Sequence, residues 1–298
     1  MSRLQRAALL VPAAVLLFAG CAAPSSTTEP PVAPTGSGSP SAGPALDCSP
    51  DTLALVNPGT LTISTSKPAY PPYVLDDDPT SGEGFESAVA YAVADKLGFD
   101  ASQVSWTYVT FEQTFAPGAK TYDFGLQQVS ITPKREKAIT FSTPYYAANQ
   151  AVVALKSDSA ATSATSIEDL QALKLGAQVG STSLTYITDV IVPSQEPYVF
   201  NDTDGAKQAL KNGTIDAIVV DLPTAFYITA AEINGSTVVG QFEADQLPGD
   251  KWGLVMKKDS PLAPCVDQAL AGLDSSGELT SIRDKWLSTT VKVPYFTP

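Results

Sequence analysis

A polar turn ending in an arginine carries the residues of this chain best suited to hold a small anion. The apolar run 124–131 breaks at Ser130-Ile131-Thr132-Pro133, and Arg135 follows three residues after the threonine. A guanidinium offers a planar fork of donors that grips a carboxylate through two parallel hydrogen bonds. The chain has only four arginines against fourteen lysines, and Arg3 and Arg6 lie in a segment that we expect to be removed. This economy favours anion binding by Arg135 over an ordinary surface role.

Two further polar positions follow predicted strands. Gly180-Ser181-Thr182 comes after a strand predicted over 173–179 and opens a helix, where free backbone amides favour an anion. Asp221 ends the apolar run 215–220, just before Pro223. Its carboxylate could bind a cation such as an ammonium group, or it could cap the helix that Pro223 begins.

Alternating strands and helices must position these turns. Period-2 and apolar runs predict strands at 61–65, 104–109, 124–131, 152–155, 173–179, 215–220 and 252–256. Helical spacing and start signals predict helices at 85–97, 204–210, 262–273 and 278–286, and a helix start at 166–169. This alternation is typical of an α/β fold with mostly parallel sheets, in which ligands bind at the carboxyl ends of strands. The three polar turns all lie at such ends.

Composition excludes several classes of function. The absence of histidine rules out Ser-His-Asp and Cys-His catalysis and any histidine-based metal site. No Gly-rich phosphate loop or paired-carboxylate signature is present, so we expect no metal, no cofactor and no catalytic residue. A net charge of −13 argues against nucleic acid and anionic lipid as partners, because both need basic patches.

The N-terminal fifty residues predict export. Residues 1–20 have two positive charges and an apolar run too short to span a bilayer, which fits a secretory signal peptide. The run ends at Leu17-Phe18-Ala19-Gly20-Cys21, which resembles a bacterial lipobox with Cys21 as the lipidated residue. The alternative is an ordinary signal peptide followed by a chance cysteine. Residues 21–50 are rich in Pro, Ser, Thr, Gly and Ala and are predicted to be a disordered tether.

Two cysteines remain if Cys21 carries lipid. Cys48 and Cys265 could form a disulfide in an oxidising compartment, or they could be two separate thiols.

Several motifs in register resemble the polar amino-acid-binding family of solute-binding proteins that feed ABC importers. The resemblance covers the chain from about Leu53 to Trp286. It rests on Pro68-Ala-Tyr-Pro-Pro-Tyr73 with Gly84-Phe85-Glu86, on Tyr122 to Tyr146 with its Thr-x-x-Arg turn, on Gly180-Ser-Thr182, and on Ala209-Leu-Lys-Asn-Gly213 with Asp216-Ala-Ile-Val-Val-Asp221.

The resemblance implies a two-lobed, type II periplasmic-binding-protein-like fold with two mostly parallel sheets joined by two hinge strands. Lobe one would comprise 51–147 and 250–298, and lobe two 148–249, with crossings near 147–151 and 243–250. Cys48 and Cys265 would then share a lobe. The protein would be a monomeric, non-enzymatic lipoprotein on the outer face of the cytoplasmic membrane, attached by its lipid alone. It would close on an amino acid and deliver it to the permease subunits of an ABC importer.

The resemblance also implies roles for individual residues. The ligand carboxylate would be held by Arg135, Ser130, Thr132, Gly180, Ser181 and Thr182, and the ammonium group by Asp221 and Gln128. Tyr70, Tyr73, Phe111 and Lys67 would form the side-chain pocket, although aromatic residues commonly pack in a core instead.

Two departures from the family pattern bear on the function. Lys67 stands near the position where relatives that bind basic or amide side chains have an aspartate, so it favours an acidic or neutral ligand unless it points to solvent. Glu86-Ser87-Ala88 replaces the common Asp-x-Asp and has no interpretation from sequence. A ligand-sensing lipoprotein and a dehydratase-like enzyme on the same scaffold are the alternative functions.

Overall fold

The structure is a computed structural model that describes residues 46–242, 251–287 and 292–297. The predicted signal peptide, Cys21 and most of the tether lie outside the described residues, as does the crossing expected at 243–250. Within the described part, no helix is long and apolar enough to cross a membrane.

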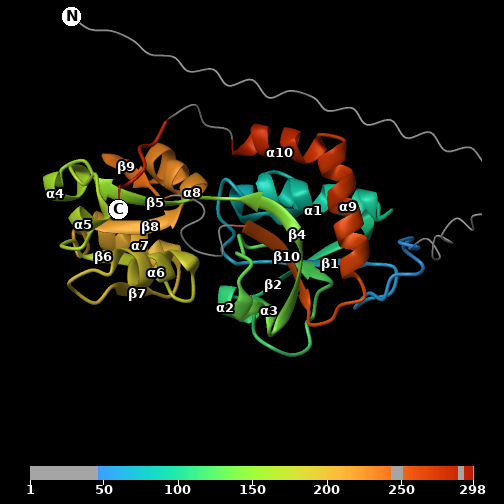
Figure 1. The fold of residues 1–298 in the computed structure, drawn as a ribbon. Helices are drawn as coiled ribbons and strands as arrows, with labels where there is room; N and C mark the ends of the chain where they lie inside the picture. The colour runs from blue at the N-terminus through green and yellow to red at the C-terminus, as the bar shows by residue number, and fades with distance from the viewer. Residues whose placement is uncertain (1–45, 243–250, 288–291, 298) are drawn as a thin grey trace, which may run out of the picture. The chain divides into compact units, whose positions relative to one another are not determined.

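Lobe one contains a five-stranded sheet in the order β2-β1-β3-β10-β4 (Figure 1). Its strands are β1 (Leu61–Thr65), β2 (Val104–Tyr108), β3 (Phe124–Gly125), β4 (Ile139–Ala147) and β10 (Lys251–Lys257). Its helices are α1 (Phe85–Lys96), α2 (Phe111–Thr114), α3 (Pro133–Glu136), α9 (Ala263–Ser275) and α10 (Glu278–Trp286), with 3-10 turns at Leu75–Asp77, Pro79–Ser81 and Ala101–Gln103.

Lobe two contains a second five-stranded sheet in the order β7-β6-β8-β5-β9. Its strands are β5 (Gln150–Leu155), β6 (Leu175–Gln178), β7 (Tyr198–Phe200), β8 (Ala217–Asp221) and β9 (Ser236–Gln241). Its helices are α4 (Ser159–Thr162), α5 (Ile167–Leu170), α6 (Thr182–Thr185), α7 (Thr203–Lys211) and α8 (Leu222–Tyr227), with π-helical turns at Tyr186–Ile191 and Ile228–Glu232.

Both sheets are mixed but mostly parallel, as expected, because in each sheet four strands run in one direction and a single strand runs against them. In lobe one, β1 pairs in parallel with β2 and β3, whereas β10 is antiparallel to both β3 and β4. Lobe two repeats this pattern, because β6 is parallel to β7 and β8, and β5 is antiparallel to β8 and β9. The antiparallel strands are those next to the crossings between the lobes. The chain reverses direction there, and the spacing of apolar residues in the sequence does not reveal this reversal.

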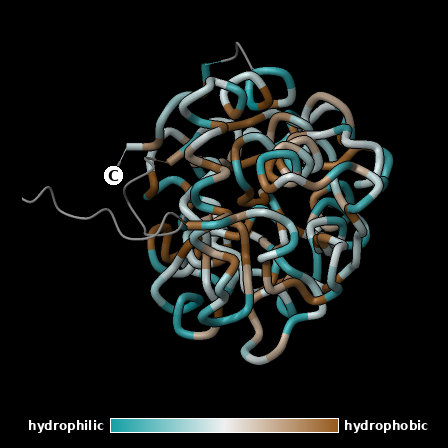
Figure 2. The backbone as a smooth tube through the Cα atoms, turned by 90° about the vertical axis from the view of Figure 1, so that its right-hand side faces the viewer, coloured by the Kyte–Doolittle hydropathy of each residue, from teal (hydrophilic) through white to brown (hydrophobic). Residues whose placement is uncertain are grey.

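Each lobe has its own apolar core. The lobe-one core packs α1, α9 and the inner face of the first sheet, and lobe two has a cluster on each face of its sheet. In Figure 2 the hydrophobic segments concentrate in the interior and the hydrophilic ones at the outer turns. Strand β1 is buried along its whole length, as its position inside the sheet requires.

Helix α1 starts against the loop that precedes it because Gly84 allows a close approach. Gly84 has φ 103°, and a Cβ there would lie 2.4 Å from the carbonyl oxygen of Tyr73. The amides of Phe85 and Glu86 donate to the carbonyls of Pro72 and Tyr73. The Gly-Phe-Glu motif therefore ties α1 to the loop that carries Tyr70.

The strand expected at 124–131 is much shorter in the structure. Strand β3 ends at Gly125, and the chain then turns through Gln128, whose φ is 52°. Ser130 returns to the sheet through an isolated bridge to Trp252 of β10. Val129 is fully buried below this turn, so its apolar character comes from packing and not from a regular strand. The sequence also gave no indication of β4.

The disulfide is present. Cys48 is bonded to Cys265 of α9 with a Cα–Cα distance of 5.5 Å. The bond closes a loop of 217 residues and attaches the first described segment to lobe one.

The first crossing lies where it was expected, because β4 ends at Ala147 in one sheet and β5 begins at Gln150 in the other. The C-terminus differs from the expectation that residues 250–298 all belong to lobe one. After α10, Tyr295 forms a bridge to Gln241 of β9 and Thr297 forms one to Ser166, the residue before α5, so this segment pairs with lobe two. The chain therefore passes between the lobes a third time.

Phe296 anchors this C-terminal segment in the lobe-two core. Its side chain is buried, its ring centroid lies 5.1 Å from that of Phe242, and a Cβ on Gly240 would come within 2.6 Å of its ring. The amide of Phe296 also donates to the carbonyl of Gln241.

We predict that Phe296→Ala lowers the free energy of unfolding by about 3 kcal/mol, because it opens a cavity beside Phe242. Urea unfolding followed by circular dichroism would measure the change. Tyr295→Ala is the matched control, because Tyr295 is 49% exposed and its loss should cost less than about 0.5 kcal/mol. Equal stability of the two variants would show that the segment does not contribute to the core.

Candidate functional site

A cavity of about 90 Å³ lies between the two lobes. Lobe one contributes Tyr70, Phe111, Gln127 and Gln128 to its wall. Lobe two contributes Gln178, Ser181, Thr182, Thr203, Asp221 and Thr224. These residues come from the carboxyl ends of strands and the first turns of helices, where the alternation of elements predicted a site.

The lobes touch one another around this cavity. The Tyr73 hydroxyl lies 2.8 Å from the Thr224 hydroxyl, and the Ser130 hydroxyl lies 3.2 Å from that of Thr182. In both pairs the first residue belongs to lobe one and the second to lobe two. The structure is therefore a closed arrangement of the lobes.

Arg135 is buried and joins the two lobes. Its N–H groups donate to the carbonyl of Ser130 at 2.7 Å and to the carbonyl of Gly180, in lobe two, at 3.0 Å. These bonds use two of the five N–H donors of a guanidinium. The ring centroids of Phe111 and Phe115 lie 5.4 and 4.6 Å from the Cζ atom of Arg135. Burial lowers the pKa of Arg135 to about 10, and the charge of Asp221 partly offsets this effect.

Thr132 and Ser181 act as helix caps. The Thr132 hydroxyl accepts a bond from the Arg135 amide at the start of α3, and the Ser181 hydroxyl accepts one from Leu184 at the start of α6. Thr132 therefore positions Arg135 and does not line the cavity, whereas Ser181 and Thr182 do. Gly180, with φ 70°, turns its carbonyl toward the guanidinium.

Asp221 lies at the end of β8 and lines the cavity. Although it precedes α8, its side chain makes no cap bond to that helix, so capping is not its role. Its Oδ1 instead accepts a 2.6 Å bond from Gln150, the first residue of β5. The side-chain oxygen of Gln150, Oε1, in turn accepts a bond from the Ser183 hydroxyl. Sequence reasoning missed Gln150, because a fully buried glutamine at a strand start has no distinguishing pattern.

The three expected aromatic residues have different roles. Tyr70 and Phe111 line the cavity, whereas Tyr73 does not. Tyr73 is 1% exposed and packs edge-on against Trp252 in the lobe-one core. Its hydroxyl reaches across to Thr224, so Tyr73 supports closure and is not part of the pocket wall.

Lys67 is not a pocket residue, which corrects the expectation from sequence. Its side chain is 58% exposed, and its amine lies 3.9 Å from Asp77 and 4.6 Å from the ring centroid of Tyr108. Lys67 therefore points to solvent, which was the alternative considered from sequence. For this reason Lys67 does not favour an acidic ligand in the cavity.

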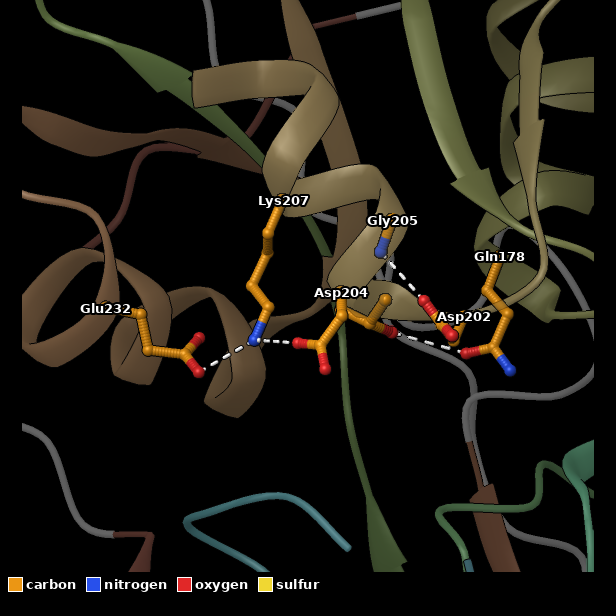
Figure 3. A network of polar contacts seen from close by, with 7 residues as sticks. Gln178, Asp202, Asp204, Gly205, Lys207 and Glu232 are labelled. Carbon is orange, nitrogen blue, oxygen red and sulfur yellow. Dashed lines mark hydrogen bonds and ion pairs between the residues drawn. The ribbon is translucent and has the colours of Figure 1, made fainter. Parts of the chain in front are cut away.

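A buried lysine, Lys207, lies between two carboxylates of lobe two (Figure 3). The Lys207 amine lies 2.7 Å from both Asp204 and Glu232, and 5.2 Å from the Tyr70 ring centroid. Burial alone would lower the pKa of Lys207, but its bonds to the two carboxylates raise it overall. Both of its carboxylate partners belong to lobe two, so the lysine is already neutralised.

The Tyr70 hydroxyl is buried near Asp204, without a hydrogen bond of standard geometry among the described residues. Burial raises its pKa above the usual value, and the charges of Asp204, Asp202 and Glu232 add to the rise. Nearby, the hydroxyl of Thr203 donates to the side-chain oxygen of Gln178. This end of the cavity therefore has polar groups in a negative electrostatic environment.

Gln127 and Gln128 supply further polar groups from lobe one. The side-chain amide of Gln127 donates to Val109 and Thr114, and its buried oxygen has no partner in the described part of the chain. Gln128, which was expected to contact the ammonium group, lines the cavity. Its backbone N–H donates a hydrogen bond to the Glu86 carboxylate. No cluster of acidic residues or cysteines with metal-ligand geometry occurs among the residues described.

Comparison with known proteins gives a consistent result. The model of the bacterial extracellular solute-binding proteins, family 3, matches residues 61–289. The L-cystine-binding protein TcyJ of Escherichia coli (strain K12) is 28% identical over 78% of this chain and 84% of its own. Solved structures of an ancestral arginine-binding protein, one bound to arginine and one to glutamine, are both 30% identical with a TM-score of 0.65. They cover 77% and 78% of this chain, and each match spans 99% of the solved chain.

Proposed function

Because the chain belongs to the bacterial extracellular solute-binding proteins of family 3, we propose that it captures an amino acid by hinge closure and delivers it to an ABC importer. Relatives named as amino-acid-binding proteins, among them the L-cystine-binding protein TcyJ, support binding rather than catalysis.

The observation that carries the proposal is the pair of opposite charges beside one cavity. Arg135 reaches from lobe one to Gly180 behind the cavity, and Asp221 lines it from lobe two. Asp221 is close enough to influence the titration of Arg135. An amino acid has a carboxylate and an ammonium group on one carbon, so its head group would complement both charges at once.

Individual roles follow from this complementarity. The ligand carboxylate would be held by the three N–H donors of Arg135 that do not bond the two carbonyls. The hydroxyls of Ser130 and Thr182 and the turn at Gly180 and Ser181 would add further donors. Asp221 and the Gln127 and Gln128 side chains would accept the ammonium group. Tyr70 and Phe111 would flank the ligand side chain.

The ligand side chain would be neutral or cationic. It would point toward Tyr70, where Asp202, Asp204 and Glu232 outnumber the single Lys207. Since Lys207 already has two carboxylate partners, it cannot attract an acidic side chain. The sequence favoured an acidic or neutral ligand. A neutral side chain suits this environment, an acidic one does not, and a cationic one also suits it. Relatives named for cystine and for arginine fall within these classes.

Closure would follow from the ligand's contacts with both lobes. A ligand bound to lobe one alone lacks the Thr182 and Asp221 contacts, so it binds the closed state more tightly and shifts the population toward it. The importer's permease subunits would read that closed form. The lobes would move about the crossing between Ala147 and Gln150.

Export as a lipoprotein is the final part of the proposal. Its support is the short apolar N-terminal run ending in Leu17-Phe18-Ala19-Gly20-Cys21 and the tether that follows. The disulfide between Cys48 and Cys265 suits an oxidising compartment. The mature monomer would be held at the outer face of the cytoplasmic membrane through Cys21.

We predict that L-arginine or L-glutamine raises the thermal midpoint by several degrees at saturation, whereas L-glutamate leaves it nearly unchanged. The physical reason is the excess of carboxylates near Tyr70. A thermal-shift screen followed by calorimetry would measure it, and agmatine, which lacks the carboxylate of arginine, is the control. Tight binding of glutamate alone would contradict the assigned ligand class.

Arg135→Ala should weaken binding of the amino acid that gives the largest shift by about a hundredfold or more, because the ligand carboxylate loses its charged partner. Unfolding of the ligand-free variant should change little, since the lost carbonyl bonds are offset by removal of a buried charge. Lys134→Ala is the control, because Lys134 is exposed on the same helix. Wild-type affinity in Arg135→Ala would refute the role.

Cys21→Ser should move the protein from the membrane fraction to the soluble exported fraction and abolish incorporation of labelled palmitate. Ser25→Ala, in the adjacent tether, should leave both unchanged. Fractionation and fluorography measure the two outcomes. A Cys21→Ser protein that still carries label would rule out this cysteine as the attachment site.

A further inference from the structure

Glu86 is a buried carboxylate that the proposed binding roles do not use. It is the second residue of α1 and only 1% exposed. No lysine or arginine among the described residues forms an ion pair with it. A buried charge without a counter-ion needs several hydrogen bonds to be tolerated, so its partners are informative.

Three donors converge on the Glu86 carboxylate. The backbone N–H of Gln128 donates to Oε1 at 2.7 Å, and the Gln128 side-chain amide donates to Oε2. The Tyr145 hydroxyl donates to Oε1. An ionised carboxylate is an acceptor only and satisfies all three donors, whereas protonation turns one oxygen into a donor that the two N–H groups of Gln128 cannot accept and only the Tyr145 hydroxyl could.

The two partners belong to the two parts of the molecule that ligand capture would use. Gln128 lines the cavity and has φ 52°, a left-handed conformation that costs a non-glycine residue about 1 kcal/mol or more unless something holds it. Tyr145 lies in β4, two residues before that strand ends and the chain crosses to lobe two. One carboxylate therefore fixes the cavity turn and the strand that enters the hinge.

We propose that Glu86 is a positioning residue, which in its ionised form holds Gln128 in the ligand-binding conformation and couples it to hinge strand β4, so that amino-acid affinity rises with the ionisation of Glu86. This inference rests on the proposed function. It also gives a role to the Glu86-Ser87-Ala88 segment, which sequence alone did not explain. The carboxylate does not touch the ligand, and it acts through Gln128.

The titratable groups that face Glu86 do not change charge near neutrality. They are Tyr145 from β4 and Tyr73 from the loop before α1, and burial raises the pKa of both well above the usual value. Asp221 acts on both tyrosines from lobe two. Burial also raises the pKa of Glu86 to about 7, against which its bonds from Tyr145 and Gln128 act.

The sign of the pH effect separates positioning from mere packing. Because the pKa of Glu86 is raised on folding, its carboxyl makes the folded state less stable as pH rises from its unfolded pKa through about 7. Affinity should change in the opposite direction, since ionisation completes the bonds to Gln128. A role in packing alone would make affinity follow stability.

The test measures Kd by calorimetry for L-arginine and L-glutamine between about pH 5 and pH 8, a range in which neither changes charge. In the wild type, affinity should rise about tenfold across this range, the worth of about one hydrogen bond. Glu86→Gln should bind weakly and without that pH dependence. Glu83→Gln, an exposed glutamate just before α1, should match the wild type.

Tyr145→Phe provides the second variant should Glu86→Gln fail to fold. It keeps the ring but removes the one donor from β4 that lowers the pKa of Glu86, so the midpoint of the affinity profile should move to higher pH. A wild-type affinity that is flat with pH, or an unmoved midpoint in Tyr145→Phe, would overturn the inference while leaving amino-acid binding intact. Absence of wild-type binding to either amino acid would overturn the proposed function and this inference with it.

Discussion

Keeping two opposite charges beside a buried cavity requires neutral groups that fix each of them in place, and the structure around the cavity supplies such groups. Arg135 and Asp221 are the two fixed charges, and each is itself held by neutral groups. The guanidinium bonds carbonyls from both lobes, and Gln150 orients the carboxylate. Because a buried charge that can move loses the benefit of its position, these supports matter as much as the charges themselves.

The supports lie at the places where the chain passes between the lobes. Gln150 is the first residue of the strand after the crossing, and Tyr145 lies just before it. Tyr73 closes against Thr224 from the same aromatic cluster around Trp252. A hydrogen bond from Gln150 to Asp221 thus connects the strand after the crossing to the wall of the cavity.

The C-terminal segment adds a constraint of a different kind. Its backbone pairs with β9 and the loop before α5, and Phe296 fills the space that Gly240 leaves open. Lobe two is therefore completed by residues that follow the last helix of lobe one. Adding a side chain at Gly240, or removing the phenyl ring of Phe296, would disturb this packing.

The sequence by itself determined the alternation of strands and helices and the polar turns that carry Arg135 and Asp221, because periodicity and turn chemistry are local properties. The family resemblance supplied the two lobes. Tertiary structure decided the rest. Strand direction, the third passage of the chain, the exposure of Lys67 and the burial of Tyr73 depend on which distant segments pack together. The same is true of Glu86, whose neighbours Gln128 and Tyr145 are 42 and 59 residues away, and no local pattern records a contact of that range.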